Sequence, residues 1–133
     1  MTHNDESAAL LNFTNRLLNA IAAKDWGAYA ALTDASLTCF EPEACGHLVE
    51  GMAFHQFYFQ LGGGSRPGNT TVVEPHGRVM GDVAVVSYVR LVQAAGDDGP
   101  ETAAFEETRV WQRQQGQWKH VHFHRSKAGT TRK

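Results

Sequence analysis

Three arginines stand in stretches of sequence that are otherwise apolar or aromatic: Arg90 in YVRL, Arg109 in TRVW and Arg125 in FHRS. Charged side chains are rarely buried without a partner, and the guanidinium fork can bind a carboxylate or a phosphate through two parallel hydrogen bonds. If the three segments are neighbouring strands, the arginines can converge on one cavity that holds a small anion. The alternative is an ordinary ion pair with a glutamate of the chain, for which the candidates are Glu50, Glu106 and Glu107.

His120, His122 and His124 occupy alternate positions near the end of the chain. Residues two apart on a strand share a face, so the sequence predicts all three on one face of one strand. Neutral imidazole is a common zinc ligand, but such side chains lie about 7 Å apart, and zinc seldom takes three ligands from one strand. We therefore expect histidines that pack at an interface or bond to neighbours, with no metal and no cofactor.

A general base could be supplied by His55, Glu50 or Glu106. Such a base needs a suitable pKa and must reach the proton that it removes, and neither property is visible in the sequence. No Ser-His-Asp or Cys-His arrangement can be assembled, and the glycine-rich loop, His-Arg-Asp and Asp-Phe-Gly motifs of protein kinases are absent. We expect a binding or assembly module rather than an enzyme, with His55 as the catalytic candidate if the protein is one.

The helices that must position these residues come first in the chain. Apolar residues recur at helical spacing over about residues 5–24, where Asp5 or Ser7 is the predicted cap. Asp25 is the predicted N-cap of a second, short helix. A third helix is predicted over about residues 51–61 and ends at three glycines, residues 62–64; it is apolar on almost every side, which predicts burial on more than one side.

The remainder of the chain has the apolar period of two that is typical of strands. Strands are predicted near residues 37–40, 69–80, 83–93, 101–114 and 117–126, with hairpin turns at Gly81-Asp82, Gly96–Pro100 and Gln115-Gly116. Helices followed by an antiparallel meander indicate the α+β class. We expect one domain over residues 1–126 and a disordered basic tail over residues 127–133.

The segment from Val83 to Val92 is apolar on both of its faces. Its two sets are Val86, Tyr88 and Val92 on one face and Val85, Val89 and Leu91 on the other. The helices can cover only one face of the sheet. The apolar residues on the second face therefore predict that this face contacts another copy of the chain. The alternative is a strongly curved sheet that covers its own second face.

Composition places limits on the class of protein. The chain has 133 residues, of which 42% are hydrophobic and 20% charged, which is typical of one soluble domain. A net charge of -2 gives no reason to expect nucleic acid or a membrane surface as partner, and no segment is apolar enough to span a bilayer. The polar N-terminus lacks a secretory signal, and Cys39 and Cys45 are expected to be reduced, so we expect a cytoplasmic protein.

Four segments carry a resemblance to a known family: FEPEACGHLVEGMAFHQFYF at residues 40–59, YVRL at 88–91, EETRVW at 106–111 and HVHFHRS at 120–126. In order and spacing they resemble the association domain of calcium/calmodulin-dependent protein kinase II, a branch of the nuclear transport factor 2-like, or SnoaL-like, superfamily. The resemblance covers nearly the whole chain. It implies a cone in which three helices pack into a curved antiparallel sheet.

The resemblance also implies a function. The pocket of that domain is lined by arginines that match Arg90, Arg109 and Arg125, and a histidine on its third helix matches His55. In that family the pocket binds small carboxylates. We add Tyr58 to the residues expected to bind the ligand. It implies a stand-alone homo-oligomer, with a dimer as the base unit of any higher ring. The alternatives are an isomerase, dehydratase or cyclase that uses the same pocket, and a purely structural assembly domain.

Overall fold

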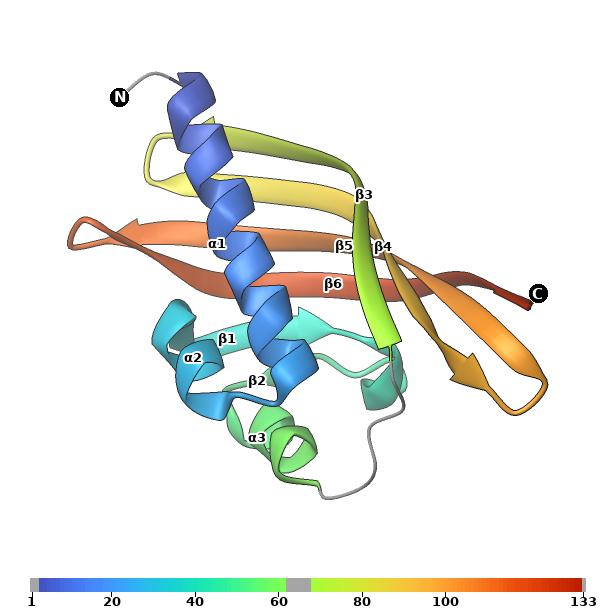
Figure 1. Ribbon diagram of the computed structural model, residues 1–133. Helices are drawn as coiled ribbons and strands as arrows, with labels where there is room; N and C mark the ends of the chain where they lie inside the picture. The colour runs from blue at the N-terminus through green and yellow to red at the C-terminus, as the bar shows by residue number, and fades with distance from the viewer. Residues whose placement is uncertain (1–2, 62–67, 133) are drawn as a thin grey trace.

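The structure, a computed structural model, describes residues 3–61 and 68–132 of the chain. Helices α1 (His3–Ala23), α2 (Trp26–Leu32) and α3 (Ala53–Gln60) lie on one face of a curved six-stranded sheet (Figure 1). The predicted α+β class is therefore confirmed. Among the helices that the structure describes, none is long and apolar enough to cross a membrane.

The sheet has the strand order β2-β1-β6-β5-β4-β3. Its strands are β1 (Thr33–Phe40), β2 (Val49–Glu50), β3 (Gly68–Met80), β4 (Val83–Gly96), β5 (Gly99–Gln114) and β6 (Gln117–Arg132). The predicted hairpins join β3 through β6. The correction to the predicted architecture is that β1 runs parallel to β6, which makes the sheet mixed rather than antiparallel. Parallel neighbours need a long connection, and here most of the chain separates the two strands.

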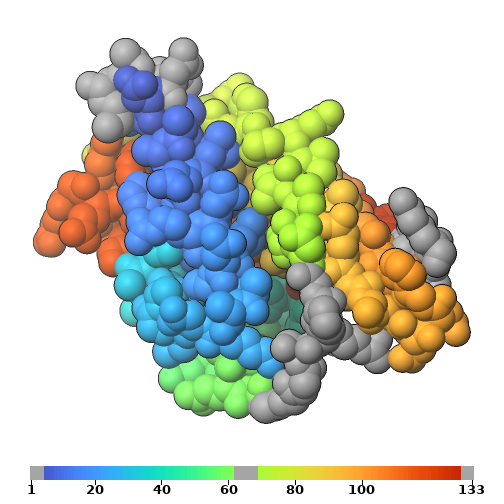
Figure 2. Space-filling model, viewed as in Figure 1, coloured from blue at the N-terminus to red at the C-terminus, as the bar shows by residue number. Residues whose placement is uncertain are grey.

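Side-chain alternation along β4 separates an inner from an outer face. The inner residues Ala84, Val86 and Tyr88 are buried and pack in one core with Leu10 and Leu17 of α1. The outer residues are only half-buried: Val85, Val89 and Leu91. In the space-filling view, α1 and α2 cover the middle of the inner face, whereas the hairpin of β4 and β5 extends beyond them (Figure 2).

Among the register shifts of the described strands, one in β3 and one in β6 help to shape the sheet around the helices. In β3 the pairing with β4 shifts between Val73 and His76, and Glu74 has a left-handed φ of 50°; the strand bends in this region (Figure 1). In β6 the pairing with β5 shifts because His120 pairs with Trp111 whereas His122 pairs with Val110. Bulges of this kind insert one residue and bend a strand, so they help the sheet to curve.

The bulge in β6 overturns the prediction that three histidines share one face. The extra residue reverses the alternation between His120 and His122. His120 is completely buried and stacks on the Phe123 ring on the inner face. His122 instead bonds to the Thr38 hydroxyl at 2.7 Å, and both His122 and His124 contact the Phe40 ring.

Helix α3 also differs from its prediction. Only His55 is buried on it, while Phe57 and Tyr58 are 51% and 43% exposed and Leu61, just beyond it, is 45% exposed. The helix sits at one end of the helical layer (Figure 1), so burial on more than one side is wrong for a single chain. The three glycines expected to end this helix lie outside the described residues.

At both ends of the chain, regular secondary structure extends beyond the predicted bounds. Helix α1 already includes Asp5 and Ser7, the expected caps. Where a disordered tail was predicted, residues 127–132 continue β6 and pair with residues 101–105 of β5. The physical reason is that residues 101–105 of β5 pair with β4 along one edge only, and their backbone groups on the other edge need the hydrogen-bond partners that β6 supplies.

Asp25 caps α2 as predicted, because its carboxylate accepts a hydrogen bond from the Ala28 backbone N–H at 3.1 Å. We expect Asp25→Ala to lower the free energy of unfolding by about 1 kcal/mol, since it removes this acceptor. Asp25→Asn keeps an acceptor oxygen and should stay near the wild-type value. Urea unfolding at one protein concentration measures both, and an equal loss in the two variants would contradict the capping role.

Candidate functional site

A cavity of about 180 Å³ lies between the helices and the inner face of the sheet. Its wall contains all five residues that the sequence singled out: His55, Tyr58, Arg90, Arg109 and Arg125. The arginines come from β4, β5 and β6, which are adjacent strands. The structure therefore brings the five residues together, and their role in binding an anion stays a prediction.

Glu107 is the shared partner of the three arginines. Its Oε1 atom accepts hydrogen bonds from the Tyr88 hydroxyl at 2.7 Å and from Arg109 Nη2 at 3.0 Å. Its Oε2 atom lies 2.8 Å from Arg90 Nε and 3.5 Å from Arg125 Nε. These last two contacts are ion pairs. None of the three atoms that form them makes a hydrogen bond within the part of the chain that the structure describes. The three arginines thus line one cavity and also form the predicted ion pairs with a glutamate of the chain, which is Glu107.

The strand register explains this arrangement. Tyr88, Glu107 and Arg125 lie directly opposite one another on three consecutive strands, so their side chains form one row on the inner face. Glu106, one residue earlier, is exposed, and Glu50 is exposed on β2. Neither of these two candidate bases therefore lines the pocket.

Arg109 is the most deeply placed of the three arginines, with 1% of its surface exposed. Its Nε donates to the Tyr88 hydroxyl at 2.8 Å, and its guanidinium stacks over the Phe123 ring with 4.6 Å to the centroid. Burial alone would raise the pKa of Glu107, but Arg109 and Arg90 outweigh that effect and hold the pKa below its usual value. Glu107 is therefore ionised, and the group is a charged cluster in the interior of the cone.

Arg125 is the most accessible member of the cluster. Its Nη1 donates to both carboxylate oxygens of Glu43, at 2.7 and 3.0 Å, and its guanidinium lies 4.1 Å from the Phe105 ring centroid. Glu43 belongs to the short 3-10 turn η1 (Pro42–Ala44) that follows β1. Three guanidiniums thus pair with the carboxylates of Glu107 and Glu43 at the pocket, whose wall also includes a third carboxylate, that of Glu41.

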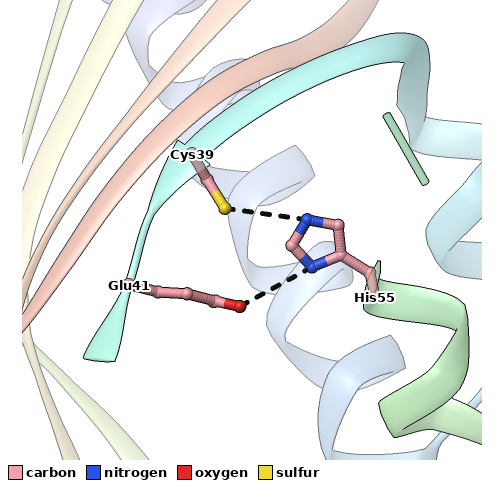
Figure 3. Close-up of side chains that lie close together, drawn as sticks. All are labelled: Cys39, Glu41 and His55. Atoms are coloured by element: carbon pink, nitrogen blue, oxygen red, sulfur yellow. Dashed lines mark hydrogen bonds and ion pairs between the residues drawn. The ribbon is translucent and has the colours of Figure 1, made fainter. Parts of the chain in front are cut away.

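A second group of side chains meets beside the pocket (Figure 3). His55 Nε2 lies 3.7 Å from Cys39 Sγ, and His55 Nδ1 lies 3.8 Å from Glu41 Oε1. Sequence reasoning found no Cys-His arrangement and did not select Cys39 or Glu41. The available signal was their spacing, because residues two apart at the end of a strand project to the same side.

Burial is the largest cause of a shifted pKa in each of these three side chains. Burial, with the nearby Glu41 charge, raises the pKa of the Cys39 thiol to about 12, while burial and then Glu43 raise the pKa of Glu41 to about 7. Burial and then the Arg109 charge lower the pKa of His55 to about 4. His55 is therefore a neutral imidazole at neutral pH, and so low a pKa makes it a weak general base.

Comparison with known proteins places these features in a family. The family whose model matches residues 6–129 is the calcium/calmodulin dependent protein kinase II association domain. The delta subunit of that kinase from Oryctolagus cuniculus is 46% identical over 125 residues, which are 91% of this chain. The chain spans 24% of the length of that relative.

Solved structures agree with this match. The hub homology domain of the same kinase from Chlamydomonas reinhardtii has a TM-score of 0.87 and 46% identity, over 93% of this chain and 99% of that one. A protein from Pseudomonas putida KT2440 described as NTF2-like has a TM-score of 0.77 at 16% identity, over 92% and 87% of the two chains. The second likeness concerns the fold alone, and it confirms the predicted nuclear transport factor 2-like cone.

Glu107→Gln tests the central carboxylate. The variant keeps the shape of the side chain but leaves Arg90 and Arg109 buried without a negative partner. Removing one partner of a buried pair typically costs about 3–5 kcal/mol, and we expect the free energy of unfolding to fall by about that amount in chemical denaturation. Glu50→Gln, at an exposed position on β2, should change it by less than about 0.5 kcal/mol. Similar losses for the two variants would contradict the role assigned to Glu107.

Proposed function

The chain belongs to the calcium/calmodulin dependent protein kinase II association domain family, and from this membership we propose that it is an assembly module with a binding site for a small organic anion. The anion is a carboxylate that binds to the pocket wall formed by Arg90, Arg109 and Arg125. The observation that carries the proposal is the convergence of three guanidiniums on one cavity, where one of the three nearby carboxylates, Glu41, has its pKa raised to about 7 by burial.

The charges and the size of the pocket support a small acid as ligand. A bound carboxylate could share Arg125 with Glu43, whose side chain is 39% exposed, and it would compensate positive charge wherever Glu41 is protonated. The cavity of about 180 Å³ is smaller than the range of about 300–1,000 Å³ typical of sites for drug-sized ligands. Phe59 and Phe123 form apolar parts of the wall and suit a short hydrocarbon body.

The family and the sheet together support assembly of identical chains. The solved relative is itself a hub domain, and β4 of this chain keeps an apolar outer face that none of the described helices covers. Val85, Val89 and Leu91 on that face are half-buried in the single chain. Apolar patches of this kind commonly mark interfaces, and identical chains commonly pair about a twofold axis. We propose a dimer as the base unit.

Sedimentation velocity at micromolar concentration should therefore show a dimer or a larger species. Val89→Glu places a charge on the outer face of β4 and is expected to shift the distribution towards smaller species, because an unpaired charge is costly to bury. Val89→Ile keeps the face apolar and should leave the distribution unchanged. A wild-type protein that sediments as a monomer throughout would contradict the assembly proposal.

Arg125 is the better arginine for testing the anion site. Arg109 is buried against Glu107, so its truncation would disturb the fold itself, whereas Arg125 lies at the open side of the cluster with 14% of its side chain exposed. We expect calorimetry with a panel of short-chain carboxylic acids to detect binding to the wild-type protein. Arg125→Ala should weaken it by about 2 kcal/mol, or about 30-fold in Kd.

Arg78→Ala is the matched control, because Arg78 is exposed on β3 and does not line the pocket. It should bind the acids as the wild-type protein does. An equal loss of affinity in both arginine variants would point to a general charge effect. No binding of any acid to the wild-type protein would contradict the anion site and leave the assembly role alone.

A further inference from the structure

Cys39, Glu41 and His55 present three different ligand atoms to one small region beside the pocket (Figure 3). A sulfur, a carboxylate oxygen and a ring nitrogen all lie within 4.8 Å of one another. Cys39 comes from the end of β1, Glu41 follows that strand directly, and His55 comes from α3. The fold thus brings together residues from two elements that are separate in the sequence.

We propose that this cluster is a binding site for a divalent transition-metal ion, and that zinc is the ion that fits it best. Thiolate, imidazole and carboxylate are the three side-chain ligands that zinc uses in proteins. With bonds of about 2.0–2.3 Å to zinc, ligand atoms of a tetrahedral site lie about 3.3–3.7 Å apart. Cys39 Sγ and His55 Nε2 are already 3.7 Å apart. Glu41 Oε1 lies 3.8 Å from the other ring nitrogen, Nδ1, so the Glu41 side chain must turn towards the sulfur to share an ion with these two ligands.

The surroundings hold two of the ligands in place before any metal arrives. Cys39 is completely buried in a cluster with Leu37 and Phe123. The His55 ring is contacted by the rings of Tyr29, Phe54 and Phe123, at 6.2, 5.6 and 5.7 Å between centroids. Restricted side chains lose little freedom when they bind a metal, which favours affinity.

The three residues leave a fourth coordination position for a water or an exogenous ligand. Glu41 and His55 line the cavity, so this position faces the same space as the arginines. Zinc sites with three protein ligands and one open position are the type that binds substrates or anions, in contrast to closed structural sites with four protein ligands.

The charges also balance in this arrangement. Zinc carries two positive charges, and the Cys39 thiolate and the Glu41 carboxylate supply two negative ones. This balance matters because Arg109 and Arg125 face the same cavity and would disfavour an uncompensated cation. On binding, the thiol proton is released to solvent while the sulfur bonds to the metal.

Cobalt is a suitable probe because its coordination to a thiolate gives a charge-transfer band in the near ultraviolet. We expect one equivalent of Co²⁺, added to the purified metal-free protein in the absence of organic acids, to produce this band, and Zn²⁺ to remove it by displacement. Cys39→Ser should abolish the band and weaken Zn²⁺ binding at least about 10-fold. Cys45→Ser is the control, because Cys45 is the exposed thiol outside the cluster, and it should retain both properties.

Glu41→Gln provides a second variant, since it leaves the buried thiol in place. It should keep the thiolate band and bind Zn²⁺ more weakly, because an amide oxygen is a poorer ligand than a carboxylate. The proposal is overturned if the wild-type protein gives no thiolate band, if Cys39→Ser binds Zn²⁺ as tightly as wild type, or if the band depends on Cys45. In those cases the cluster is only a chain of polar contacts, and the anion proposal is unaffected because no acid is present in the assay.

Discussion

One buried carboxylate, that of Glu107, organises the interior of the cone. Its two oxygens contact Tyr88, Arg90, Arg109 and Arg125, which come from three adjacent strands. Desolvation of so many charges is unfavourable, and buried ion pairs often contribute little net stability. What the cluster provides is position, because each guanidinium is fixed relative to the others and to the cavity. A site that must recognise a small charged molecule needs this fixed geometry more than it needs additional stability.

The same row of side chains depends on the register of the sheet. Glu107 sits opposite Tyr88 on one side and Arg125 on the other, and a shift of one residue would turn the carboxylate to the outer face. Apolar residues on the same inner face as this row fix the register, because Val86 and Trp111 are completely buried against α1. The helical layer therefore acts on the site indirectly, by holding the strands that carry its charges.

The sequence was sufficient to predict those features that depend on nearby residues alone, such as the alternation of a strand or the cap of a helix. Charged residues inside apolar strands located Arg90, Arg109 and Arg125, and helix-capping chemistry located Asp25. It failed where geometry is set by distant contacts: the bulge that separates His120 from His122 leaves no trace in the alternating pattern, and the parallel pairing of β1 with β6 joins the two halves of the chain. The Cys39 cluster was missed for the same reason, since its third member comes from a different element.

The cavity has two regions of opposite chemical character, and their proximity has a thermodynamic consequence. The arginines favour a negative ligand, whereas Cys39 and Glu41 offer acidic groups that favour a cation or a proton. A cation at the second region would reduce the repulsion between Glu41 and an anion held by Arg125, and it would therefore raise the affinity for that anion. Binding free energies are reciprocal, so the anion would raise the affinity for the cation by the same factor. The two proposed sites would then be coupled through the Coulomb interactions within this cavity, without any conformational change.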